Sequence, residues 1–165
     1  MHKRYVQTAP IAVLAALAVV GCGSSSNHLN KAQYADRANA ICKQAATATV
    51  SARATLDKLP APKPGAHVTA AQLAEAAQAE NTEAAAMKTV ATKVRALGTP
   101  STNANLAGEV SSGFALIAAD QAALARAAAS HSIHAIAAAF LKLKSDSHHL
   151  DPAVTRLGVN SCTQI

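Results

Sequence analysis

The stretch NKAQYADRANAICKQAATATVSARATLDKL, residues 30–59, decides how this chain folds. Asn30 is followed three residues later by Gln33, which is the spacing of a helix capping box. Apolar side chains then recur at alternating steps of three and four, so they share one face of a helix. These side chains are Tyr34, Ala38, Ile41, Ala45, Ala48, Ala52, Leu56 and Leu59. The stretch predicts a long amphipathic helix, which the proline-rich run at residues 60–65 ends because proline has no N–H to donate.

Three further segments repeat this pattern and predict three more helices. The second begins at Thr69 and ends at Gly98, the third covers about residues 102–130, and the fourth begins near Ser132. Their apolar stripes consist of Leu73, Ala77, Ala84, Met87, Ala91 and Val94, then Leu106, Val110, Phe114, Ile117, Leu124 and Ala128, then Ile136, Phe140, Leu143, Leu150, Val154 and Leu157.

The last predicted helix contains a proline. Asp151 as a cap, Pro152 at the first helical position and Gly158 beyond the end would form a short final helix. We therefore expect a kink or a break at Pro152. No segment alternates with period two, so the fold class is predicted as all-α, an up-and-down antiparallel four-helix bundle with a kinked or broken last helix.

Two polar residues, Glu80 and Gln121, fall at core-like spacing in their helices. Either they lie at the edges of the apolar stripes, or they form a buried polar pair that sets the register of the helices. Both interpretations are open from the sequence.

Composition limits the classes of function. Hydrophobic residues make up 50% of the chain and aromatic residues only 2%, because alanine dominates the apolar content. This composition favours helices and supplies few large side chains for a deep pocket or an interface. There is no basic run with interleaved aromatic residues, so nucleic acid is not an expected partner.

The start of the chain has the pattern of a bacterial lipoprotein signal peptide. Lys3 and Arg4 precede an apolar run, residues 9–20, that is shorter than the ~20 residues of a membrane-spanning helix. The run ends in Val-Val-Gly-Cys, which resembles a lipobox, so Cys22 is expected to carry lipid after residues 1–21 are removed. We expect a flexible tether at 22–29, a helical domain at 30–165, and lipid anchoring on the extracytoplasmic face of the cell membrane, because two or three acyl chains anchor durably.

Two cysteines then remain, Cys42 and Cys162. In an oxidising compartment they are expected to form a disulfide, which by chain entropy contributes roughly 5 kcal/mol for a loop of about 120 residues. Two free thiols or a pair of metal ligands are the alternatives.

The segment Tyr34-Ala-Asp-Arg-Ala-Asn-Ala-Ile-Cys42, together with Arg156-Leu-Gly-Val-Asn-Ser-Cys162, resembles a group of small actinobacterial exported proteins and lipoproteins. The resemblance covers nearly all of the chain after the signal segment. It implies a helical bundle, a bridge between Cys42 and Cys162 and an anchored extracytoplasmic location. It implies no activity, because none is established for the group.

Metal binding and catalysis have little support. His131 and His134 stand at i and i+3, so both could reach one metal if the local backbone is helical, and His148 with His149 forms a second cluster. Neither has a cysteine or a close set of acidic partners, so we expect no cofactor. Motifs for hydrolases, phosphate loops and zinc proteases are absent from the sequence. We expect a non-enzymatic envelope module that binds an unidentified protein partner. A carrier of a metal or small apolar ligand is the alternative, and an enzyme acting on cell-wall material is a third.

Overall fold

The computed structural model describes residues 28–59 and 68–164. Four long helices follow one another, α1 (Lys31–Leu56), α2 (Ala70–Ala96), α3 (Ala104–Ala129) and α4 (Ile133–Leu157), before a short 3-10 helix, η1 (Asn160–Gln164). These ranges contain no strand, and the predicted all-α four-helix bundle is confirmed. The expected signal peptide, Cys22 and the proline-rich connection lie outside the described residues, as does the expected tether except for residues 28 and 29.

Local sequence signals set the beginnings of three helices. Asn30 and Gln33 form a complete capping box at α1, and Thr69 and Gln72 form one at α2. Ser132 accepts a hydrogen bond from the Ala135 N–H at the start of α4. These side chains satisfy backbone N–H groups that have no partner within the first turn.

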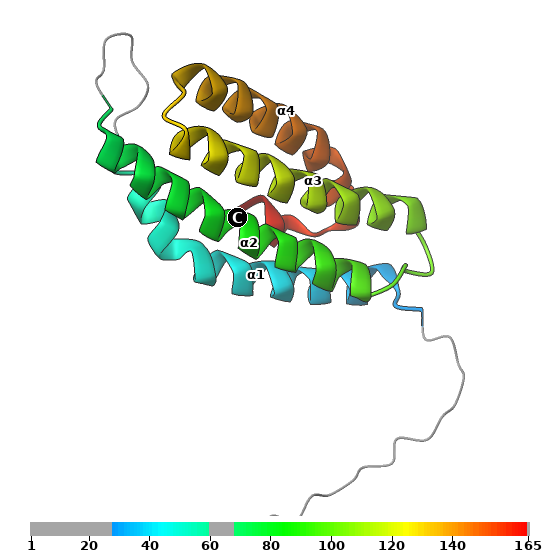
Figure 1. The fold of residues 1–165 in the computed structure, drawn as a ribbon. Helices are drawn as coiled ribbons and strands as arrows, with labels where there is room; N and C mark the ends of the chain where they lie inside the picture. Colours follow the sequence, from blue (N-terminus) through cyan, green and yellow to red (C-terminus); the bar gives the residue numbers. More distant parts are fainter. Residues whose placement is uncertain (1–27, 60–67, 165) are drawn as a thin grey trace, which may run out of the picture.

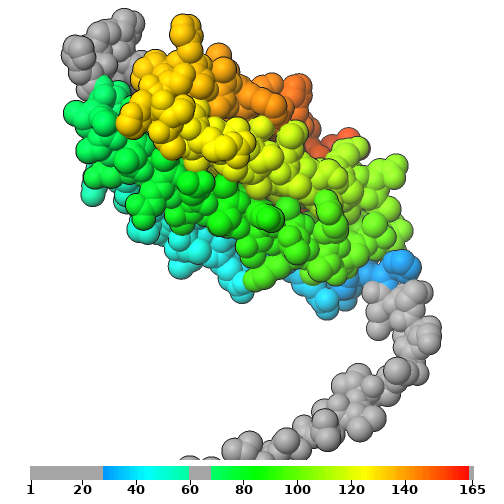
Figure 2. Space-filling view, viewed as in Figure 1, coloured from blue at the N-terminus to red at the C-terminus, as the bar shows by residue number. Residues whose placement is uncertain are grey.

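The helices lie side by side in chain order, and each runs opposite to its neighbour (Figure 1). The most extensive packing is between α2 and α3, followed by α3 with α4 and α1 with α2. Figure 2 shows the face formed by α2 and α3, with α1 along one edge and α4 along the other. The two outer helices are connected through η1, which packs against both α1 and α4. Figure 1 shows this tail in red behind α2, near the middle of the molecule.

The main core is concentrated in the half of the bundle that contains the tail. It combines the N-terminal half of α1, the C-terminal half of α2, much of α3 and the C-terminal end of α4. Its largest fully buried side chains are Tyr34, Phe114, Leu157, Val90, Val94, Val110, Val154 and Val159. At the other end a small cluster of Ala76, Ala77 and Ala128 is covered by Leu56, Leu59 and Ile136. The chain therefore places its few large apolar residues mostly around the tail.

The last helix is not broken at Pro152. α4 continues from Ile133 to Leu157 with Pro152 inside it, so the predicted restart with Asp151 as a cap is wrong. Proline removes one helical hydrogen bond and crowds the preceding turn. Leu150, Ala153, Val154 and Leu157 are all buried on either side of it, and their packing offsets that loss. Gly158 ends the helix as predicted, with a left-handed φ of 81° that favours glycine.

The buried stripe of α4 also differs from the prediction. Phe140 was expected in the core but is 55% exposed. The stripe passes instead through Ile136, Ala139 and Leu143, which are half-buried, before it reaches Leu150. Of the described helices, α3 is the one against which α4 packs most extensively. The apolar residue beside the stripe is therefore left in solvent.

One glycine of α3 lies in close contact with a side chain of α4. A Cβ atom added at Gly113 would lie 2.5 Å from Cδ1 of Leu150. A larger residue at this point would force the end of the Leu150 side chain to move, in a core that is packed as densely as an organic crystal.

Candidate functional site

Three polar side chains from three helices meet between α1, α2 and α3. They are Arg53, Glu83 and Gln121, and we call them the Glu83 cluster. Glu83 on α2 is 8% exposed. Its Oε1 lies 3.3 Å from Nε of Arg53 on α1, and its Oε2 accepts a hydrogen bond of 3.2 Å from Nε2 of Gln121 on α3. Burial raises the pKa of Glu83, while the charge and hydrogen bond of Arg53 oppose that rise. The cluster links the three helices through charge-assisted contacts, which are stronger than neutral ones.

The sequence pointed to part of this cluster but to the wrong pair. Gln121 is buried, at 4% exposure, as the second interpretation required, but it bonds to Glu83 and not to Glu80. Glu80 is half-buried one helical turn before Glu83. Burial and the negative charge of Glu83 together raise the pKa of Glu80 to about 7. The sequence reasoning missed Glu83 and Arg53, although Glu83 lies four residues before Met87 and therefore on the core side of α2.

Beside the Glu83 cluster lies a cavity of about 230 Å³, which we call the tail cavity. It is bounded by α2, α3, α4 and η1. Its apolar walls are Met87, Phe114, Ile117, Leu143, Leu150 and Val154. Its polar lining consists of Glu83, Gln121, Ser147, Asp151 and Thr163, with Cys162 contributing to the wall formed by the tail. Polar and apolar groups therefore line the cavity in comparable measure, and small-molecule sites combine both kinds of group.

One residue of this lining, Gln121, has a polar atom without a partner. Gln121 Oε1 is buried and makes no hydrogen bond. The orientation of the amide follows from its neighbour, because Nε2 is the atom that can donate to the Glu83 carboxylate. A buried acceptor without a donor costs roughly 1–3 kcal/mol, so a donor that reached it would be stabilised.

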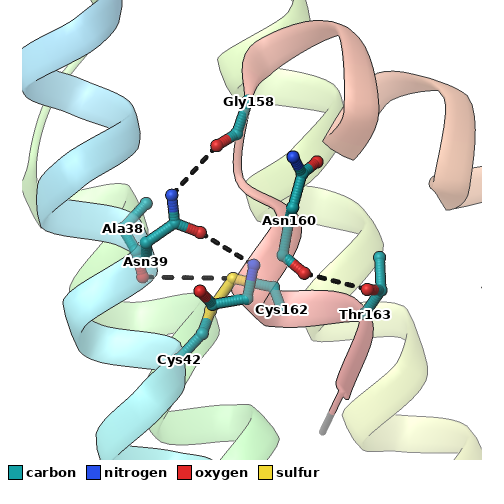
Figure 3. Close-up of a disulfide and its surroundings, with 8 residues drawn as sticks. Ala38, Asn39, Cys42, Gly158, Asn160, Cys162 and Thr163 are labelled. Atoms are coloured by element: carbon teal, nitrogen blue, oxygen red, sulfur yellow. Dashed lines mark hydrogen bonds between the residues drawn. A yellow bond between two sulfur atoms is a disulfide. The ribbon is translucent and has the colours of Figure 1, made fainter.

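The tail that forms one wall of the cavity is held by a disulfide and by one amide side chain (Figure 3). Cys42 on α1 is bonded to Cys162, which confirms the predicted bridge and excludes the alternative of free thiols or a metal pair in this structure. Asn39, one turn before Cys42, donates from Nδ2 to the Gly158 carbonyl at 2.9 Å, and its Oδ1 accepts from the Ser161 N–H at 2.8 Å. The position of the tail therefore depends on the segment of α1 that carried the family resemblance.

A second polar group joins α3 to α4. Lys142 Nζ lies 2.7 Å from Oδ1 of Asp120 and 2.6 Å from Oδ2 of Asp146. Asp120 is 4% exposed, and burial raises the pKa of its carboxyl although the hydrogen bond from Lys142 opposes the rise. The Lys142 hydrogen bond lowers the pKa of Asp146. The lysine is thus shared between one buried and one half-exposed carboxylate, which positions α4 on α3.

The histidines proposed as weak metal candidates are not brought together on a helix. His131 precedes α4 in a turn, with a left-handed φ of 56°, whereas His134 lies in the first turn of α4. Both are exposed, and so are His148 and His149. Across residues 28–59 and 68–164, no group of three or more His, Cys, Asp or Glu residues is placed to hold a metal ion.

The first half of α4 exposes an apolar surface, which we call the α4 face. It consists of Ile133, Ala137, Phe140 and Leu141, which fall within about 100° of the helix circumference. Ile133 is 62% exposed, Phe140 55% and Leu141 65%. Residues 133–149 include no buried side chain, so this half of the helix is joined to the bundle by one side only.

None of the described helices is both long and apolar enough to cross a membrane. Comparisons of the chain with known protein families, with curated proteins and with solved structures found no match.

Proposed function

We propose that this protein is a non-enzymatic module, anchored by lipid on Cys22 to the extracytoplasmic face of the cell membrane, that binds another envelope protein through the α4 face. The anchoring part rests on the basic start, the short apolar run and the lipobox-like tetrapeptide of residues 1–22. The disulfide between Cys42 and Cys162 supports an exported location, because such bonds persist in oxidising compartments.

The observation that carries the binding part is the exposure of Ile133, Phe140 and Leu141. The chain has only two phenylalanines, and one of them lies largely in solvent. Contiguous exposed apolar residues of this kind mark interaction surfaces.

The position of the α4 face favours a protein partner over the membrane itself. The chain enters the bundle next to the α2–α3 connection, where the Ser101 N–H donates to the Leu29 carbonyl at 2.9 Å. α4 begins at the opposite end of the bundle (Figure 1). A module anchored through residues before Leu29 can therefore present the start of α4 away from the anchor.

A site-specific crosslinker tests this proposal. A photoreactive phenylalanine analogue at Phe140, in cells that export the full chain, should yield a discrete protein adduct. The same analogue at Thr92, an exposed position on α2, should yield none. Adducts to lipid alone, or equal adducts at both positions, would contradict the proposed partner. A Cys22→Ala variant should separately release the protein from membranes if the anchor is correct.

A second function is favoured by the tail cavity, namely the carriage of a small ligand. Apolar side chains form part of the cavity lining, and one lining residue, Gln121, has a buried acceptor without a partner. Native mass spectrometry of the membrane-extracted protein should then show a bound small mass that is lost on denaturation. Protein extracted without any added mass would argue against a carrier.

A further inference from the structure

The polar groups that line the tail cavity are mainly hydrogen-bond acceptors. Glu83 and Asp151 contribute carboxyl groups, Gln121 an amide oxygen, and Ser147 and Thr163 hydroxyls. Lys, Arg and His do not occur among the residues that line it. A guest is therefore offered acceptors and two carboxyl groups, of which Glu83 is already paired with Arg53, and hydroxyl groups are the main donors.

Gln121 is the least exposed of these polar residues, and one of its polar atoms lacks a partner. Gln121 is 4% exposed, its Nε2 is committed to Glu83, and its Oε1 is buried without a hydrogen bond. A guest N–H that reached Gln121 would supply the missing donor, and a positive charge on that guest would face Glu83 and Asp151.

The remaining walls are apolar. The apolar part of the lining consists of Met87, Phe114, Ile117, Leu143, Leu150 and Val154. The ring of Phe114 adds a face that attracts cations. The volume of about 230 Å³ equals on the order of eight waters, which suits a compound with a short hydrocarbon body.

We propose that the tail cavity binds a small primary ammonium compound with a short apolar chain, its nitrogen at Gln121 and Glu83. This inference deepens the carrier function and rests on it. The guest enters between α4 and η1, where Ser147, Asp151 and Thr163 form the rim. Because Cys162 belongs to the same wall, the disulfide with Cys42 holds the site in shape.

Calorimetric and NMR titrations of the disulfide-bonded protein with hexylammonium, butylammonium, hexanol and hexanoate test the proposal. Hexylammonium should bind saturably. Each buried methylene changes affinity about fourfold, so butylammonium should bind roughly 16-fold more weakly. Hexanol and hexanoate should bind at least tenfold more weakly than hexylammonium.

Two variants locate the site. Gln121→Leu removes the acceptor, and Leu143→Trp fills the cavity from a half-buried wall position; each should weaken hexylammonium binding at least tenfold. Gln78→Leu, on the exposed side of α2, is the matched control and should bind normally. If Gln121→Leu does not fold, Leu143→Trp still decides the location.

The outcomes separate the two proposals. If hexanol bound as tightly as hexylammonium, or hexanoate bound more tightly, the carrier function would still be supported. The inference of an ammonium ligand would be overturned. Absence of saturable binding by all four compounds would overturn the inference and remove the support that the cavity lends to the carrier. Unchanged binding in both variants would show that the cavity is not the site.

Discussion

Replacement of Glu80 by glutamine should stabilise the protein at alkaline pH and leave it unchanged at acid pH. Glu80 is half-buried on α2, and burial together with the charge of Glu83 raises its pKa from 4.5 to about 7. The folded state therefore binds a proton more tightly than the unfolded state does. Stability from this group is highest below about pH 4.5 and is lost as the pH rises towards 7.

The size of the effect follows from the same two values. A tenfold change in an equilibrium constant is about 1.4 kcal/mol, so a pKa moved from 4.5 to about 7 corresponds to roughly 3 kcal/mol. Glu80→Gln removes the ionisation while it keeps the shape of the side chain. The free energy of unfolding should rise by about 2–3 kcal/mol at pH 8 and change by less than about 0.5 kcal/mol at pH 4.

Urea unfolding followed by far-UV circular dichroism at both pH values measures this difference. Glu75→Gln is the matched control, because Glu75 is exposed on the same helix. It should change the free energy of unfolding by less than about 0.5 kcal/mol at either pH. A gain for Glu80→Gln that is the same at pH 4 and pH 8, or no larger than that of Glu75→Gln, would refute the reasoning.

Three further changes should affect packing and the tail. Gly113→Ala should lower the free energy of unfolding by about 1 kcal/mol, because the new Cβ would lie 2.5 Å from a side chain on α4. Gly108→Ala is the control in the same helix, with open space around it, and should raise the free energy of unfolding by about 0.5–1 kcal/mol. If urea unfolding showed a gain for both variants, the contact at Gly113 would not be a tight one. Asn39→Ala should lower the free energy of unfolding by about 1–2 kcal/mol, because it removes two hydrogen bonds to the tail. Amide hydrogen exchange should become faster only in residues 158–164 and their contacts. Unchanged exchange in these residues would contradict the role assigned to Asn39. Joint replacement of Cys42 and Cys162 by serine should lower the free energy of unfolding by about 3–5 kcal/mol, because the disulfide joins residues 120 positions apart. Thermal or urea unfolding measures this loss. A loss below about 1 kcal/mol would contradict the chain-entropy argument and mean that the unfolded chain is already compact.

The α4 helix shows where sequence patterns stop being sufficient. Ala139 and Phe140 are both apolar and adjacent, so either one continues the spacing that connects Ile136 with Leu143. The structure turns Ala139 towards α3 and leaves Phe140 largely in solvent. Periodicity specifies a face only to within about one residue, and the position of the neighbouring helix decides the rest.

The Glu83 cluster illustrates the same limit for polar residues. Glu80 and Glu83 both lie within two turns of Met87 and both are candidates to meet Gln121 from α3. Only the register between α2 and α3 determines that Gln121 bonds to Glu83. Arg53 joins from α1, 30 positions away in sequence, so its role is not visible in a local pattern.

The sequence alone determined the four helices, the caps at Asn30 and Thr69, and the cysteine pair, because these depend on hydrogen bonds within one turn or on a simple count of thiols. Only the tertiary structure decided that α4 continues through Pro152 and that η1 lies between α1 and α4, leaving the tail cavity beside the Glu83 cluster. These outcomes depend on contacts between residues far apart in the chain. Their free energy comes from burial and packing, which no single helix can establish alone.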